Sequence, residues 1–121
     1  MNRDELLAKL KKPSRRYTEV TVPSGDTYTI QSLTLREKGE NDILLANKKD
    51  EVDLGNLPRQ KGDLLCRSIV DEHKKPILTP EDWEVWQDVD AGDTTVLLDA
   101  IQELNDTPVK GMVGNSRKTG G

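Results

Sequence analysis

The chain of 121 residues is long enough for one domain with a modest hydrophobic core, which excludes a second large domain. Hydrophobic residues make up 33% and charged residues 33%, the formal net charge is −4, and no window approaches the roughly 20 apolar residues of a membrane-spanning helix. We therefore expect that the chain is not an integral membrane protein. The single cysteine, Cys66, excludes an intramolecular disulfide.

Residues 1–16 form a basic N-terminal arm that is predicted to begin as a helix. Leu6, Leu7 and Leu10 fall on one side of this helix, which Pro13 ends. A helix of this length is not stable in water without tertiary contacts, so the leucines are expected to dock or the helix to fray. The segment has no apolar core of signal-peptide length, and we expect a cytoplasmic protein. Its basic side chains are Arg3, Lys9, Lys11, Lys12, Arg15 and Arg16.

Residues 17–31 alternate with the two-residue period of β-strands and predict a β-hairpin. Val20 and Val22 share a face with Tyr28 and Ile30, and the sequence at 24–26, Ser-Gly-Asp, supplies the turn. Two strands alone are not stable in water, so one face of the hairpin must rest on helices.

Four helices are predicted after the hairpin, at about residues 34–48, 63–74, 80–88 and 94–105. Their apolar residues recur every three or four positions and so share one helix face. Residues 49–62 are polar and predict a connector, and residues 106–121 lack apolar periodicity and predict a disordered tail. The predicted fold class is mainly α with a small N-terminal β-hairpin (α+β). A compact unit of three to four helices and the hairpin form a single globular domain over residues 17–105, followed by the flexible tail.

The residue inventory argues against catalysis and metal binding. Cys66 and His73 would lie seven residues apart on one helix, about 10 Å, which is too far for a thiolate–imidazole pair. The sequence DVDAGD at 88–93 begins like a calcium loop, but Gly92 stands where a third ligand belongs. A turn in which Asp93 caps the last helix explains the same residues. We therefore predict no enzyme activity, no metal and no cofactor.

Charge is distributed unevenly, with an acidic C-terminal half of the helical unit. Residues 81–106 hold nine Asp or Glu side chains and no Lys or Arg. Such a surface repels phosphate, so duplex nucleic acid is a poor partner, and a basic or apolar protein segment is a better one. The basic arm with Tyr17 is the single feature that supports a small nucleic-acid-binding regulator instead.

Two tryptophans in the predicted third helix either anchor the core or line a binding groove. Thr79 and Pro80 give that helix a strong start, and Trp83 and Trp86 lie three residues apart on one side of it. Tryptophan is common in cores and enriched at binding hot spots, so both interpretations stay open. The candidate partner-binding residues are Trp83, Trp86, Leu97 and Ile101.

The order of these features resembles the tail assembly chaperones of long-tailed bacteriophages. The stretches that carry the resemblance are LTLRE at 33–37, LLCRSIVDE at 64–72, LTPED at 78–82 and AIQELN at 100–105. The resemblance covers roughly residues 28–105 and rests on the order of helix starts and apolar stripes. The chain departs from it at 73–76, where it has His-Lys-Lys-Pro and such proteins often carry a glycine.

The resemblance implies a non-enzymatic assembly factor in the host cytoplasm that is absent from the mature virion. Such chaperones bind the tape measure protein and bring tail tube subunits to it. The implied partners are therefore the tape measure protein, the major tail tube protein and, by self-association, further copies of the chain. In many of them a ribosomal frameshift gives a longer form, and the tail from Asp106 onward would suit such a junction. The alternative is a structural adaptor or tail completion protein that stays in the virion.

Overall fold

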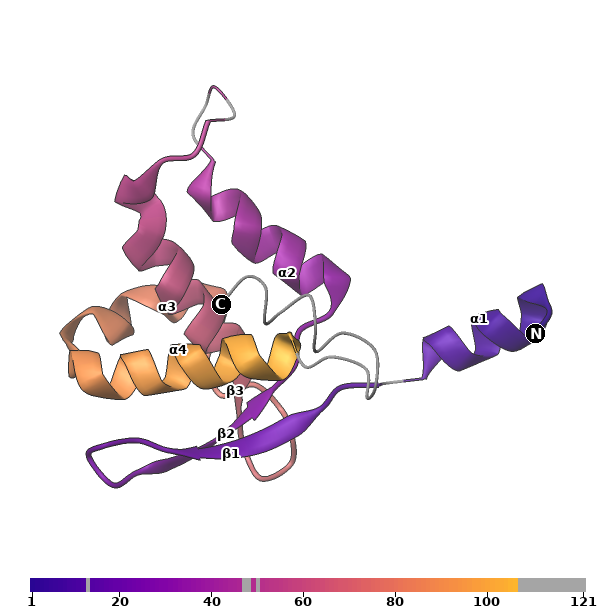
Figure 1. Cartoon of the computed structure of the whole chain (residues 1–121), viewed down its shortest axis with the longest axis horizontal. Helices are drawn as coiled ribbons and strands as arrows, with labels where there is room; N and C mark the ends of the chain where they lie inside the picture. The colour runs from indigo at the N-terminus through magenta and orange to yellow at the C-terminus, as the bar shows by residue number, and fades with distance from the viewer. Residues whose placement is uncertain (13, 47–48, 50, 107–121) are drawn as a thin grey trace, which may run out of the picture.

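A small antiparallel sheet lies beneath a set of helices, and the first helix stands apart from both (Figure 1). The computed structural model describes residues 1–12, 14–46, 49 and 51–106. The α-helices are α1 (Arg3–Lys11), α2 (Leu35–Asp42), α3 (Leu57–Ser68) and α4 (Ala91–Asn105), and the strands are β1 (Tyr17–Thr21), β2 (Thr27–Gln31) and β3 (Ile69–Val70). Three 3₁₀ segments, η1 (Ile43–Leu45), η2 (Leu54–Asn56) and η3 (Pro80–Asp88), complete the described elements.

This architecture confirms the predicted class, mainly α with a small N-terminal sheet. Among the described residues, no helix has the length and apolar character needed to cross a membrane. All but the first residue of the predicted tail, 106–121, lies outside the described residues.

The predicted hairpin is formed by β1 and β2, which pair from Tyr17 opposite Gln31 to Thr21 opposite Thr27. Gly25 in the turn has a φ of 103°, which glycine adopts without the steric cost of a side chain. The strand order β1-β2-β3 makes β2 the central strand and leaves β1 at one edge.

The core lies between the inner face of this sheet and the helices α3 and α4. A buried side chain of this size contributes about 1.5–3 kcal/mol through removal from water, so this cluster is the main source of stability. Its buried residues are Val20, Val22, Ile30, Leu65, Ile69, Leu97 and Ile101.

Helix α4 is tied to the hairpin at both of its ends. Near its start, the Asp93 carboxylate accepts a hydrogen bond from the amide of Ser24 in the hairpin turn, at 3.1 Å. At its end, the Asn105 side-chain oxygen accepts one from the amide of Leu33 after β2, at 2.7 Å. The helix begins at Ala91 because Asp90 is its N-cap, which corrects the predicted start at residue 94.

The predicted helix at 63–74 is wrong at both ends. It begins earlier, at Leu57, because Pro58 in the first turn is a helix start and not a break in a connector. It ends earlier, at Ser68, because Ile69 and Val70 pair with β2 as β3. Both residues are β-branched and suit a strand, and the edge of β2 gives their backbone hydrogen-bond partners.

A tight turn follows β3 where the chain had been expected to remain helical. The Asp71 carboxylate accepts hydrogen bonds from the amides of His73 and Lys75, at 2.7 and 3.1 Å. Between them, Lys74 takes a φ of 66°, in the left-handed region that favours glycine. Its ammonium lies 4.5 Å from the centre of the Tyr17 ring, which offsets part of the backbone strain.

The helix predicted at 34–48 is shorter than expected. Its α-helical part, α2, ends at Asp42, and the chain continues as the 3₁₀ segment η1. Its predicted capping box is confirmed. The Thr34 hydroxyl accepts from the amide of Glu37 at 3.2 Å, and the Glu37 carboxylate accepts from the amide of Thr34 at 2.9 Å.

The predicted element at 80–88 has the expected bounds but is a 3₁₀ helix.

Gly62 on α3 is expected to be intolerant of any side chain. A Cβ atom there would lie 3.0 Å from the Cβ of Trp83 and closer still to the Trp83 carbonyl oxygen, whereas a Cβ at Gly39 of α2 would meet nothing within 4 Å. We predict that Gly62→Ala lowers the free energy of unfolding by about 2 kcal/mol through overpacking. The control Gly39→Ala should raise it by about 0.5–1 kcal/mol, because alanine favours the helix. Urea denaturation of both variants checks this, and equal effects would contradict the close approach.

A two-pronged ion pair anchors the chain between α1 and β1 to α2. The Arg15 guanidinium donates to the two Glu37 carboxylate oxygens at 2.7 and 2.9 Å, and to the Ser32 carbonyl at 3.0 Å. Partial burial raises the pKa of Glu37, but hydrogen bonds from Arg15 and Thr34 outweigh it and hold that pKa below its ordinary value of 4.5.

The sign of this shift predicts how stability depends on pH. A carboxylate with a lowered pKa in the folded state stabilises the protein above its unfolded pKa, and the effect disappears as pH falls through the folded pKa. We expect Glu37→Gln to cost about 1 kcal/mol at neutral pH and to cost nothing at about pH 2. Unfolding curves at both pH values measure the difference. Glu84→Gln, at an exposed site on η3, should change stability little, and a Glu37→Gln cost that is independent of pH would refute the assignment.

Candidate functional site

An open, mostly apolar groove of about 420 Å³ lies between the start of α3, η3 and the start of α4. Lys61, Gln87 and Thr94 supply polar atoms at its border. The volume and lining suit a few apolar side chains of a partner. Its apolar walls are formed by Leu54, Leu57, Leu65, Trp86, Val89 and Leu98.

Segment η3 sets the position of the tryptophans. It starts at Pro80, and the Asp82 carboxylate accepts from the Thr79 amide at 2.9 Å, as the sequence predicts for a capped start. In a 3₁₀ helix every third side chain lies on the same side, so Trp83, Trp86 and the following Val89 form one row. The close approach at Gly62 seats Trp83 against α3, and Trp86 then faces the groove.

The four candidate partner-binding residues divide into two pairs. Trp83 and Trp86 are half-buried on η3, and Trp86 lines the groove while packing against the core. Leu97 and Ile101 are 0% and 1% exposed, within the core beneath the helices. A partner in the groove would touch Trp86 directly, whereas Leu97 and Ile101 support the surface from inside. The partner-binding role of these residues remains a prediction.

Sequence reasoning missed the outer wall of the groove. Leu54 and Leu57 come from the stretch that was predicted to be a connector, and Leu54 is 70% exposed. The signal was present, because two leucines three residues apart lead directly into the Pro58 helix start.

A second cavity, of about 310 Å³, lies between α2, α3 and the end of α4. Leu64 and Leu98 contribute apolar atoms there, and Ile101 forms part of its base, but Lys38, Asn41 and several other polar side chains share the lining. Because its walls are more polar, this cavity is less suited to an apolar partner than the groove.

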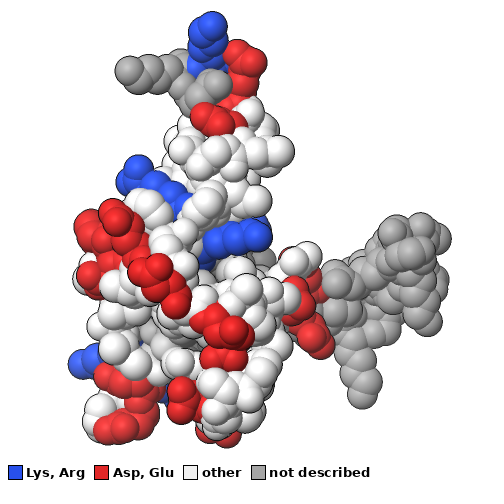
Figure 2. All heavy atoms as spheres, turned by 90° about the vertical axis from the view of Figure 1, so that its left-hand side faces the viewer, with Lys and Arg blue, Asp and Glu red and all other residues white. Residues whose placement is uncertain are grey.

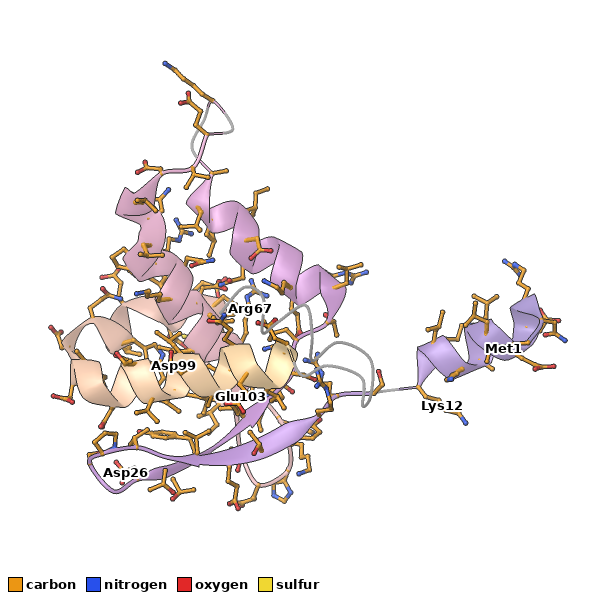
Figure 3. The ribbon with its side chains drawn as sticks, viewed as in Figure 1. Met1, Lys12, Asp26, Arg67, Asp99 and Glu103 are labelled. Atoms are coloured by element: carbon orange, nitrogen blue, oxygen red, sulfur yellow. The ribbon has the colours of Figure 1, made fainter. Side chains whose placement is uncertain are left out.

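Negative charge gathers on the side of the molecule that carries the groove. Glu84, Asp88 and Asp90 are exposed residues interleaved with or next to groove-lining residues of η3 and α4. Figure 2 looks onto this side of the molecule and shows acidic side chains gathered over its lower half. Further along α4, Asp99 and Glu103 follow one turn apart (Figure 3). The charged residue that lines the groove is Lys61, so the acidic surface attracts a basic segment to this side of the molecule, and the groove itself favours apolar side chains.

The most buried charged cluster joins α2 to α3 and has a structural role. The Asp63 carboxylate, 5% exposed, accepts from the Asn41 amide group at 2.9 Å and from the Arg67 guanidinium at 2.7 Å. Arg67 also reaches Glu40 of α2 at 2.9 Å, and Figure 3 shows it beside that helix. Because Asp63 is paired and hydrogen-bonded, the cluster stabilises the helix pair and leaves no reactive group open.

The single cysteine and the single histidine do not form a pair. Cys66 is fully buried in α3, and burial raises the pKa of its thiol, whereas His73 lies in the exposed turn after β3. The expected placement of both on one helix face is therefore wrong. Among the described residues, no group of three or more His, Cys, Asp or Glu side chains could hold a metal ion.

No model of a protein family matches this sequence, and no curated protein matches it either. A solved structure does match, that of the tail assembly chaperone of bacteriophage HK97. The match has a TM-score of 0.63 and 14% sequence identity, and covers 88% of this chain and 99% of that chain. The chain has the fold of the HK97 tail assembly chaperone.

The likeness to the HK97 chaperone confirms the family resemblance at the level of the fold. Because 99% of the chaperone is covered, the agreement concerns the complete fold and not one shared motif. The low identity explains why the resemblance rests on the order of helix starts and apolar stripes and not on individual residues.

Burial of Cys66 predicts that its thiol is unreactive toward thiol reagents in the folded protein. Because the thiolate is the reactive form, a raised pKa and full burial should both suppress reaction with a thiol reagent. We expect labelling by a maleimide to be at least about 100-fold slower in buffer than in denaturant, since reaction requires unfolding. Comparable rates in the two conditions would show that α3 opens readily.

Proposed function

We propose that the protein is a phage tail assembly chaperone that holds a helical segment of its client in the groove between α3, η3 and α4. The single observation that supports the proposal most strongly is the fold shared with the HK97 tail assembly chaperone. The client is the tape measure protein, and the chaperone brings subunits of the major tail tube protein to it. It acts in the host cytoplasm without catalysis and is absent from the mature virion.

The groove supports this role through its exposed apolar rim. Leu54 and Val89 are 70% and 36% exposed, and both line the groove together with Trp86. An amphipathic helix that lays its apolar side on such a surface removes both from water, which is the helix-in-groove mode of recognition. A groove of this size can hold about one or two turns, so each contact is weak and many copies on a long client reach high avidity together.

Substitutions at the exposed rim test the proposal without disturbing the core. Trp86 is a poor choice, because truncation of a partly buried tryptophan can cost about 3–5 kcal/mol of stability. A double variant Leu54→Ser, Val89→Ser removes the rim, and surface changes of this kind alter stability little. When this variant is co-expressed with the tape measure protein, the soluble amount of the client should fall at least about tenfold, because the contacts of one leucine and one valine are lost.

The matched control for this experiment is Leu35→Ser, at a leucine that is 91% exposed in the first turn of α2. It should leave the soluble fraction of the client unchanged. A folded rim variant that solubilises the client as well as the wild type does would reject the groove as the client site. Abundant protein in purified virions, measured by mass spectrometry, would favour the structural adaptor instead.

A further inference from the structure

A second surface lies along the outer edge of β1. In the part of the chain that the structure describes, β1 pairs with β2 and its other side has no partner strand. Arg16 and Val22, just before and after the strand, bond through their backbone to residues beside β2. Alternate residues of an antiparallel strand bond to its neighbour, so the peptide groups of Glu19 and Thr21 are directed outward. Such an edge is a template for one more strand.

This edge is one wall of a groove of about 460 Å³, which we call the β1 groove, and α4 is the other wall. Figure 1 shows α4 running along the hairpin. Ala100 and Leu104 are half-buried on α4 and supply apolar atoms to the groove. The side chains of an added strand would therefore find an apolar contact beside the edge. The remaining described residues of the lining are Thr18, Glu19, Val20, Thr21 and Glu103.

The charges of the β1 groove select a basic partner. Both charged residues of its lining, Glu19 and Glu103, are acidic. Positive charge lies beside the start of the strand, where Arg16 precedes Tyr17 and the Lys74 ammonium is 4.5 Å from the centre of the Tyr17 ring. The position that favours a basic side chain of the partner is therefore the one opposite Glu19.

We infer that the edge of β1 takes up an extended segment of another protein as a further strand, in which apolar residues alternate with Lys or Arg. Successive side chains of a strand point to opposite faces of the sheet. On the inner face, where Val20 is buried, the apolar ones meet Ala100 and Leu104. On the outer face a basic one lies opposite Glu19. Backbone hydrogen bonds to β1 supply the affinity, and the alternating side chains supply the selectivity.

This contact goes beyond the proposed function and does not depend on it. The α3–η3–α4 groove is lined by α4 residues up to Leu98, and the β1 groove by α4 residues from Ala100 onward. Two residues correspond to about 200° of rotation in an α-helix, so Leu98 and Ala100 lie on opposite sides of α4. One copy can therefore hold a helical segment and an extended segment at the same time.

Amide hydrogen exchange, followed by NMR on the full chain, tests the added strand residue by residue. The probe is the synthetic peptide Thr-Val-Lys-Val-Lys-Val-Thr with both ends blocked. At saturating peptide, exchange of the Glu19 and Thr21 amides should slow at least about tenfold, because both become hydrogen-bonded. The Val20 amide is directed toward β2 and should change little, which makes it the internal control.

Two results would overturn the inference. The first is exchange at Glu19 and Thr21 that the peptide leaves unchanged. The second is exchange at these two amides that is already as slow as at Val20 before peptide is added. Slow exchange that persists on dilution would assign the edge to a segment of the same chain, and slow exchange that is lost on dilution would assign it to a second copy.

Substitutions test the charge preference. Glu19→Gln should raise the dissociation constant of the peptide about twofold to fivefold. The control Glu84→Gln removes the same charge from an exposed site on η3 and should leave it unchanged. A peptide with Glu in place of both lysines should bind the wild type at least about tenfold more weakly. Equal effects of the two substitutions, or equal binding of the two peptides, would refute a basic partner.

The variant Leu54→Ser, Val89→Ser separates this inference from the proposed function. Both substitutions lie in the α3–η3–α4 groove and leave the lining of the β1 groove intact. The variant should therefore bind the peptide as tightly as the wild type does, whether or not it keeps the tape measure protein soluble. Loss of peptide binding in this variant would place the peptide in the other groove and refute the added strand.

Discussion

The candidate binding surface depends on the close approach of α3 and η3 at Gly62. The absence of a side chain lets the backbone of Trp83 lie directly on α3, and this contact fixes the rotation of η3. With three residues per turn, fixing Trp83 also fixes Trp86 and Val89, which follow at three-residue intervals along the same side. Gly62 therefore sets the rotation of η3 that brings Trp86 to the groove.

The parts of the fold that local chemistry determines could be predicted from the sequence. The hairpin follows from two-residue alternation around Gly25, and the capped starts at Thr34 and Thr79 follow from side chains that satisfy nearby amides. The end of α3 could not be predicted in this way. Ile69 and Val70 continue a helical apolar period, and their strand conformation depends on pairing with β2, which lies about forty residues earlier in the chain.

The candidate site shows the same limit. Periodicity indicates that Leu97 and Ile101 share an apolar side of a helix, but not whether that side faces the protein's own core or a partner. The structure places both in the core. Conversely, the glycines, prolines and charges around Leu54 predict a connector. The spacing of Leu54 and Leu57 before Pro58 indicates a helix start, but the groove wall itself forms only because η3 and α4 fold beside them.

The edge position of β1 bears on how copies of this molecule can meet. The Arg16 carbonyl accepts from the amide of Ser32, and the Val22 amide donates to the carbonyl of Asp26, on either side of β2. In this register the peptide groups of Tyr17, Glu19 and Thr21 are directed outward from the sheet. If two such edges paired symmetrically over this strand, Glu19 of one molecule would stand opposite Glu19 of the other. Like charges directly opposite each other on paired strands repel. Glu19 therefore disfavours growth of a continuous intermolecular sheet from the edge of β1. The edge of β1 is therefore poorly suited to pairing with a second copy of itself, whatever surfaces the helices offer to a partner.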